Sequence, residues 1–145
     1  MSKLIGTIRE AIEKAGLKDG MTISFHHHMR NGDYVLNMVL AEAAAMGIRD
    51  LTVNASSIFD IHEPIIEHIK NGVVTQIECN YMGGKVGKAI SQGIMEKPVI
   101  SGLMEAVPEI WKMALPKSTL LFWQHPVPMT WEISAESMDL RPAAL

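Results

Sequence analysis

The first hundred residues alternate between short apolar runs and longer stretches in which apolar residues recur at helical spacing. The short runs predict strands at residues 21–25, 51–54 and 73–77, and a fourth strand that begins at residues 98–100. The helical spacing predicts helices at residues 4–15, 35–46, 64–70 and 86–94. Gly16 and Gly47 are placed to end the first two helices, and Asp33 is placed to cap the second. Strands and helices that alternate in this way predict a parallel α/β sheet with right-handed crossovers.

The pattern changes after Ile100. All three tryptophans and five of the seven prolines lie in residues 101–145. The prolines interrupt each candidate helix or central strand, and residues 117–123 form the only apolar run that suits a strand. The chain therefore divides into residues 1–100, which form part of an α/β domain, and residues 101–145, a tail that we expect to be poorly ordered.

Composition limits the classes of protein to consider. The 145 residues are 48% hydrophobic and 20% charged, with a net charge of -3, which is typical of a globular protein. This charge gives no reason to expect nucleic acid or a membrane as a partner. Cys79 is the only cysteine, no run approaches the ~20 apolar residues that span a bilayer, and the N-terminus lacks a secretion signal. We expect a cytoplasmic protein.

The segment after the first predicted strand carries most of the candidate chemistry. His26, His27, His28 and Arg30 stand where a strand gives way to a helix, and ligands of open α/β sheets bind beyond the carboxyl ends of the strands. Imidazoles and a guanidinium there could bind a carboxylate or a phosphate. An imidazole bonded to the backbone is the alternative for at least one histidine.

Two further interpretations of this segment were weighed. A metal site would need ligands from His62, His68 or Cys79, and none of these shows a recognisable ligand spacing, so no metal is predicted. Asn31 and Gly32 suit a turn, or a loop that presents backbone N–H groups to an anion beside Arg30.

A second candidate loop follows the third predicted strand. Asn80, Gly83 and Gly84 belong to it, and paired glycines let a backbone approach a ligand closely. The loop matches no known phosphate-binding motif, so a plain strand-to-helix turn is the favoured alternative. His62 and Glu63 are expected at a helix entry, and Cys79 is expected to be buried.

From about Gly16 to Ile100 the sequence resembles the N-terminal part of the citrate lyase alpha chain, the citrate CoA-transferase subunit. The motifs that carry the resemblance are Leu17–His28, Arg30–Val39, Glu67–Thr75 and Gly93–Ile100. Four such blocks in order are far more specific than one short motif. The resemblance implies a parallel-sheet fold of the NagB/RpiA/CoA-transferase-like class, of which this chain holds an N-terminal fragment.

The resemblance also implies a function. The family exchanges the acetyl group on an acyl-carrier thiol for citrate, which forms citryl carrier protein and releases acetate during the breakdown of citrate to acetate and oxaloacetate. The implied partners are a beta chain, which cleaves the citryl thioester, and an acyl carrier (gamma) chain that bears a CoA-derived prosthetic group. No cofactor is expected on this chain itself. Related CoA-transferases place their nucleophilic carboxylate in later sequence, so the catalytic residue is unknown here.

The tail departs from the family, and the genetic code offers a reason. When Gly102–Pro108 is back-translated and read from the last base of the Ser101 codon, the degenerate codons permit Arg-Thr-His-Gly-Gly-Arg-Pro, which resembles the family's continuation. We therefore interpret residues from about Ser101 onward as an out-of-frame translation, with a genuine divergent tail as the alternative. The chain would then be a catalytically inactive truncated product. A small ligand- or metal-binding module built on His26–His28 is a third interpretation.

Overall fold

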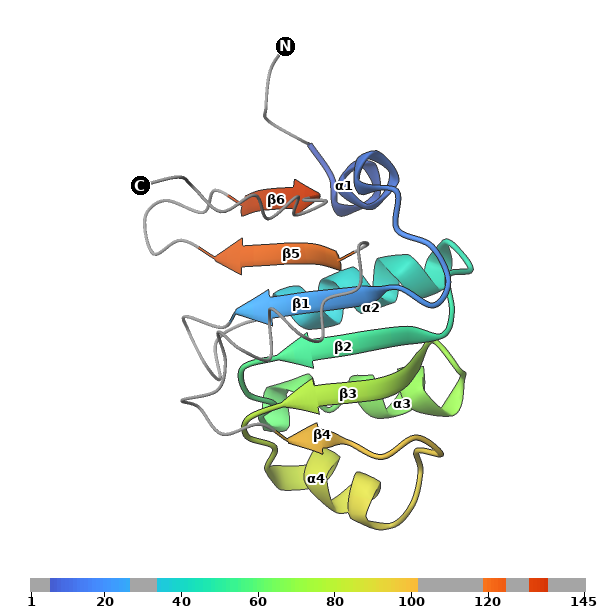
Figure 1. Ribbon diagram of the computed structural model, residues 1–145, viewed down its shortest axis with the longest axis vertical. Helices are drawn as coiled ribbons and strands as arrows, with labels where there is room; N and C mark the ends of the chain where they lie inside the picture. Colours follow the sequence, from blue (N-terminus) through green and yellow to red (C-terminus); the bar gives the residue numbers. More distant parts are fainter. Residues whose placement is uncertain (1–5, 27–33, 102–118, 125–130, 136–145) are drawn as a thin grey trace, which may run out of the picture.

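Six strands form a single sheet in the computed structural model, which describes residues 6–26, 34–101, 119–124 and 131–135 (Figure 1). The elements in chain order are α1 (Ile8–Ala15), β1 (Thr22–His26), α2 (Val35–Ala45), β2 (Leu51–Ala55), the 3-10 helix η2 (Asp60–His62), α3 (Ile65–Lys70), β3 (Val74–Cys79), α4 (Gly84–Ser91), β4 (Ile100–Ser101), β5 (Thr119–Gln124) and β6 (Trp131–Ala135). The sheet order is β4-β3-β2-β1-β5-β6.

The first four strands run parallel and follow one another in order across the sheet, as the strand–helix alternation predicts. β5 lies on the other side of β1 and is also parallel to it. β6 is antiparallel to β5. The expectation of one strand in the tail is wrong, because β6 has no continuous apolar run and instead alternates apolar Trp131, Ile133 and Ala135 with polar Glu132 and Ser134.

Helix ends follow local chemistry. The side chain of Thr7 accepts a hydrogen bond from the Glu10 N–H at 3.2 Å, so α1 begins at Ile8 rather than at the predicted Leu4. Gly16 ends α1 in the left-handed conformation, as predicted, with φ of 70°. The predicted cap at Asp33 lies outside the described residues.

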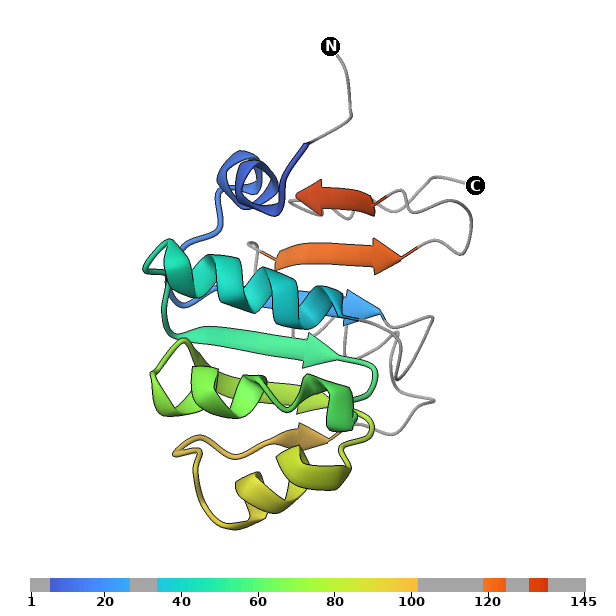
Figure 2. The same ribbon diagram turned by 180° about the vertical axis from the view of Figure 1, so that it is seen from behind.

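The two faces of the sheet differ sharply in chemistry. Helices α2 and α3 cover one face, and both lie in front of the sheet in Figure 2. Side chains at alternate strand positions, such as Ile23, Val53 and Ile77, are fully buried in the same core cluster as Leu36 and Leu40 of α2. The hydrophobic core therefore lies between the sheet and these helices.

The remaining positions of β1, β2 and β3 form a polar face. The strand positions next to Ile23, Val53 and Ile77 are polar: Thr22, Ser24, Thr52, Asn54, Gln76 and Glu78. Parallel strands are usually apolar on both faces, because helices cover both. Thr22, Ser24 and Asn54 are nevertheless buried. This face is thus chemically unlike an ordinary packing surface.

Candidate functional site

The carboxyl ends of the parallel strands define the candidate site. β1 ends at His26, so the backbone of this histidine is at the predicted edge of the sheet. His27, His28, Arg30, Asn31 and Gly32 lie outside the described residues, and their binding roles stay predictions. Asn80 follows β3 directly, and it lies at the same edge.

The loops after β2 and β3 are joined by backbone hydrogen bonds. The N–H of Ile58 donates to the Tyr81 carbonyl at 2.8 Å, and the N–H of Gly83 donates to the Ile58 carbonyl at 3.1 Å. The ladder between β2 and β3 is therefore extended beyond the strand ends. Asn80 is held between β3 and this extension.

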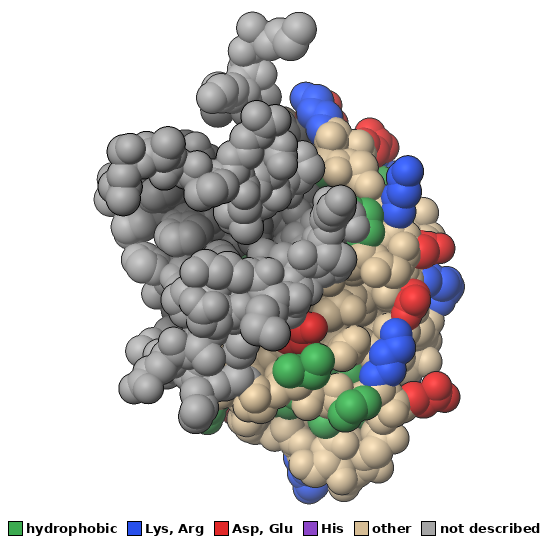
Figure 3. Space-filling model, viewed as in Figure 1, with side chains coloured by type: hydrophobic (Ala, Val, Ile, Leu, Met, Phe, Trp, Pro, Cys, Tyr) green, Lys and Arg blue, Asp and Glu red, His purple; other side chains and the backbone are tan. Residues whose placement is uncertain are grey.

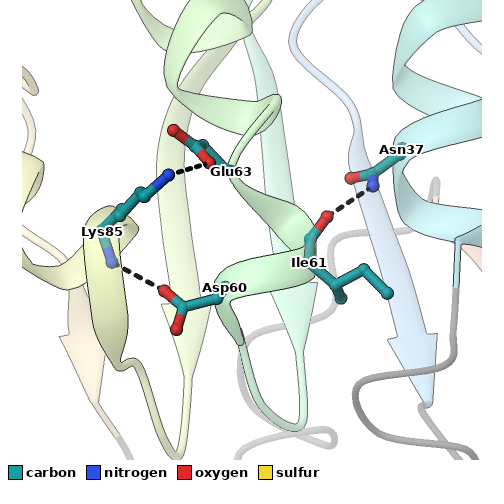
Figure 4. A network of polar contacts seen from close by, with 5 residues as sticks. All are labelled: Asn37, Asp60, Ile61, Glu63 and Lys85. Carbon is teal, nitrogen blue, oxygen red and sulfur yellow. Dashed lines mark hydrogen bonds and ion pairs between the residues drawn. The ribbon is translucent and has the colours of Figure 1, made fainter.

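The exposed carboxylate of Asp60 contacts the start of α4. The backbone N–H of Lys85 donates to Asp60 Oδ1 at 3.0 Å, as Figure 4 shows. Gly84 has φ of 59°, and a Cβ atom there would lie 1.7 Å from the same Asp60 oxygen. Only glycine suits this backbone conformation and this close approach. The contacts favour the turn interpretation of Gly83 and Gly84, because the chain itself supplies the anion at this helix end.

Further contacts hold the segment that carries Asp60. The Lys85 ammonium pairs with Glu63 at 2.7 Å, and this carboxylate raises the pKa of Lys85 (Figure 4). The Asn37 amide donates to the Ile61 carbonyl at 2.8 Å. The residues between β2 and α3 are thus tied to α2 on one side and to α4 on the other.

His62 and Glu63 lie at the entry to α3, as the sequence predicts. His62 is fully buried, and its Nδ1 accepts a hydrogen bond from the Phe59 N–H at 3.0 Å. The ring of Phe59 packs 5.6 Å from that of Tyr81, between ring centres. His62 is therefore a structural imidazole that supports the loop.

Burial shifts the pKa of two other candidate ligands, Cys79 and His68. Cys79 is buried as predicted, and burial raises the pKa of its thiol to about 11. Burial lowers the pKa of His68, on α3. Within the described ranges, no three His, Cys, Asp or Glu side chains are grouped so as to hold a metal ion.

A row of polar side chains that was not predicted from the sequence crosses the sheet. The Ser24 hydroxyl donates to Asn54 Oδ1 at 3.2 Å, and Asn54 Nδ2 donates to Glu78 Oε2 at 2.9 Å. These residues are register partners on β1, β2 and β3. A polar residue at the same alternation in each strand was the available signal, but the register that aligns them requires the structure.

Charges of both signs are mixed on the described part of one face of the molecule. Lys or Arg side chains alternate with Asp or Glu over the described part of the face in Figure 3, without a region of one sign. No helix in the part of the chain that the structure describes is long and apolar enough to cross a membrane.

The strands and helices define a largely parallel α/β domain with polar residues at the carboxyl edge of its sheet. The family model for the citrate lyase alpha subunit matches residues 1–103, and the chain belongs to that family. The predicted CoA-transferase-like α/β class is thereby confirmed.

Individual relatives agree with this assignment. The citrate lyase alpha chain of Klebsiella pneumoniae is 55% identical over 97 residues, which are 67% of this chain and 19% of that protein. The alpha chain of Haemophilus influenzae is 52% identical over the same length and covers the same shares. A crystal structure of the citrate lyase alpha subunit from Streptococcus mutans, in complex with citrate, has 64% identity and a TM-score of 0.67, and the match covers 68% of this chain and 19% of that one. The chain thus spans about a fifth of the length of these relatives.

Proposed function

We propose that this chain is the N-terminal portion of a citrate CoA-transferase and forms one wall of its citrate site. The observation that carries the proposal is the 64% identity to an alpha subunit that was crystallised with citrate. In the complete protein, the reaction would transfer citrate onto an acyl-carrier thiol and release acetate. This step belongs to the breakdown of citrate to acetate and oxaloacetate.

The proposed binding residues surround the carboxyl edge of the sheet. His26, His27, His28 and Arg30 would donate hydrogen bonds to citrate carboxylates, with Arg30 as a bidentate partner. The turn at Asn31–Gly32 would add backbone N–H groups. Asn80 would contribute an amide from β3, and Gly83 and Gly84 give its loop its shape.

Acyl exchange imposes further requirements. A carboxylate must be brought against a thioester, and donors must stabilise the developing oxyanion. We infer that the nucleophile comes from family sequence that this chain lacks. The proposed partners are a beta chain and an acyl carrier (gamma) chain in the cytoplasm, and the CoA-derived group would reach this chain as part of the carrier.

A second proposal concerns activity: the 145-residue chain is a catalytically inactive truncated product. It is supported by the end of the family match at residue 103, inside the chain. An out-of-frame tail from about Ser101 would account for that end. Sequencing the gene across that codon tests this origin, and an intact frame with the tail retained in close relatives would overturn it.

The transfer proposal is tested with purified components. The chain, a beta chain and acetylated carrier protein are mixed with citrate, and acetate release is measured beside the Klebsiella pneumoniae alpha chain. We expect citrate-dependent release from the complete alpha chain and only background release from the 145-residue chain. Comparable release from both would reject the truncation proposal. Saturable citrate binding by the short chain supports its place in the site, and absence of that binding contradicts it.

A further inference from the structure

The polar row on β1, β2 and β3 has a fixed direction. A carboxylate can only accept, so the Asn54 amide must turn its Nδ2 toward Glu78 and its oxygen toward Ser24. The hydroxyl proton of Ser24 is then committed to Asn54. The row therefore ends on the Glu78 carboxylate, which accepts a hydrogen bond from the Asn54 amide.

Packing alone does not account for this row. Ser24 and Asn54 are 3% and 9% exposed, and burial of polar groups opposes folding unless each is bonded. Apolar residues at these positions would be normal for parallel strands. The neighbouring pair of positions on this face, at Thr22 and Thr52, is also polar. Within the row only Glu78 is not buried, so a polar ligand would meet the row at Glu78.

Glu78 is at the ligand end of its strand. Glu78 is the penultimate residue of β3 and Asn80 directly follows that strand, so both lie at the carboxyl edge of the sheet. The Glu78 side chain is only partly buried, in contrast to Ser24 and Asn54. Its Oε2 is engaged by Asn54, and the second oxygen can accept another hydrogen bond.

We propose that Glu78, oriented by Asn54 and Ser24, is a specificity-determining residue that accepts a hydrogen bond from the hydroxyl group of a hydroxytricarboxylate. This inference rests on the proposed citrate site. A carboxylate repels the three carboxylates of citrate but accepts readily from its single hydroxyl. Glu78 therefore selects a hydroxy acid over the same acid without the hydroxyl.

Two opposing effects give the proposal a distinctive signature. The hydrogen bond of the hydroxyl to Glu78 strengthens binding of citrate alone, whereas the negative charge of Glu78 weakens binding of any polycarboxylate. Removal of the charge should thus improve the affinity for the analogue that lacks the hydroxyl. A merely structural residue would, when replaced, weaken both ligands together.

The test compares citrate with tricarballylate, which is citrate without its hydroxyl, by isothermal titration calorimetry on the full 145-residue chain. Wild type should prefer citrate by ~10-fold or more, because a site built to bond a hydroxyl rejects the analogue that lacks it. In Glu78→Gln, tricarballylate should bind more tightly than to wild type, and the preference should fall by several-fold. In Glu78→Asp, which keeps the charge but shortens the side chain, the preference should fall without this gain.

Glu67→Gln is the matched control, because it makes the same substitution on an exposed α3 side chain that pairs with Lys70. It should leave the preference unchanged. A preference that survives in both Glu78 variants overturns the inference, and so does equal weakening of both ligands. If neither ligand binds to wild type, the proposed citrate site itself fails. If Glu78→Gln does not fold, as judged by circular dichroism, Glu78→Asp decides.

Discussion

Asp60 approaches the start of α4 at Gly84. Paired glycines favour unusual backbone conformations, and Gly84 adopts a φ of 59°. The purpose of this freedom differs from a phosphate cradle, because the group that approaches is the carboxylate of Asp60. No pattern in the sequence links two residues that are this far apart in the chain.

Gly84→Ala should destabilise the protein by about 1–3 kcal/mol, since a Cβ atom there is strained and would strike Asp60. Urea denaturation measures the change. Gly87→Ala, three residues further along α4, is the matched control, because its Cβ would meet Met82 at an ordinary 3.5 Å. That variant should be neutral or more stable by up to about 1 kcal/mol. Equal losses in both variants would contradict the assigned role of Gly84.

Cys79 should be nearly inert in the native protein. With its pKa raised to about 11, on the order of one thiol in 1,000 is ionised at pH 8, and the side chain is buried. Alkylation by iodoacetamide, followed by mass spectrometry, should be roughly 100-fold slower in buffer than in urea. Similar rates in the two conditions would show that the thiol is accessible.

Secondary-structure elements follow the hydrophobic pattern closely where local signals decide them. β1, β2 and β3 fall within about one or two residues of the predicted runs, since apolar runs between turn residues are strong local signals. α4 begins at Gly84 rather than at the predicted Val86. The acceptor at its first turn is Asp60, from a segment 25 residues earlier in the chain, and a local pattern cannot contain this contact.

Asp60→Ala should therefore loosen the start of α4. Loss of a capping carboxylate costs about 1 kcal/mol. Amide hydrogen exchange should show faster exchange at Lys85, whose N–H donates to Asp60, while α3 amides keep their protection. Glu67→Ala serves as control, because it breaks an exposed pair and should change stability by less than ~0.5 kcal/mol. Unchanged exchange at Lys85 in Asp60→Ala would contradict the assigned contact.

At the scale of the whole molecule, the order of strands and helices predicts the edge of the sheet at which the proposed site lies. That order does not predict which side chains form hydrogen bonds with one another there. The bond from Asn54 to Glu78 depends on the register between β2 and β3, which shifts between Leu51 and Thr52. Alternation within one strand is visible in a sequence, but register between strands is set by tertiary packing. The binding roles of residues 27–33 stay predictions, because these residues lie outside the described ranges.

Restoration of the reading frame tests the interpretation of the whole chain. Insertion of one base at the Ser101 codon should replace the tail with family sequence and yield a longer chain. That chain should release acetate in the presence of citrate, a beta chain and acetylated carrier, at a rate comparable to that of a complete alpha chain. If the corrected frame reaches a stop codon within a few residues, or encodes sequence unlike the family, the frame-shift proposal is wrong.

Citrate binding by the 145-residue chain tests the central claim most directly. Calorimetric titration should show saturable binding at one site per chain, and Arg30→Ala should weaken it by roughly 10-fold or more, because a bidentate charge-assisted contact is lost. Arg49→Ala, at the opposite edge of the sheet beside the start of β2, should leave the affinity unchanged. Absence of binding to a chain with a folded circular dichroism spectrum, or binding that Arg30→Ala leaves intact, would contradict the account.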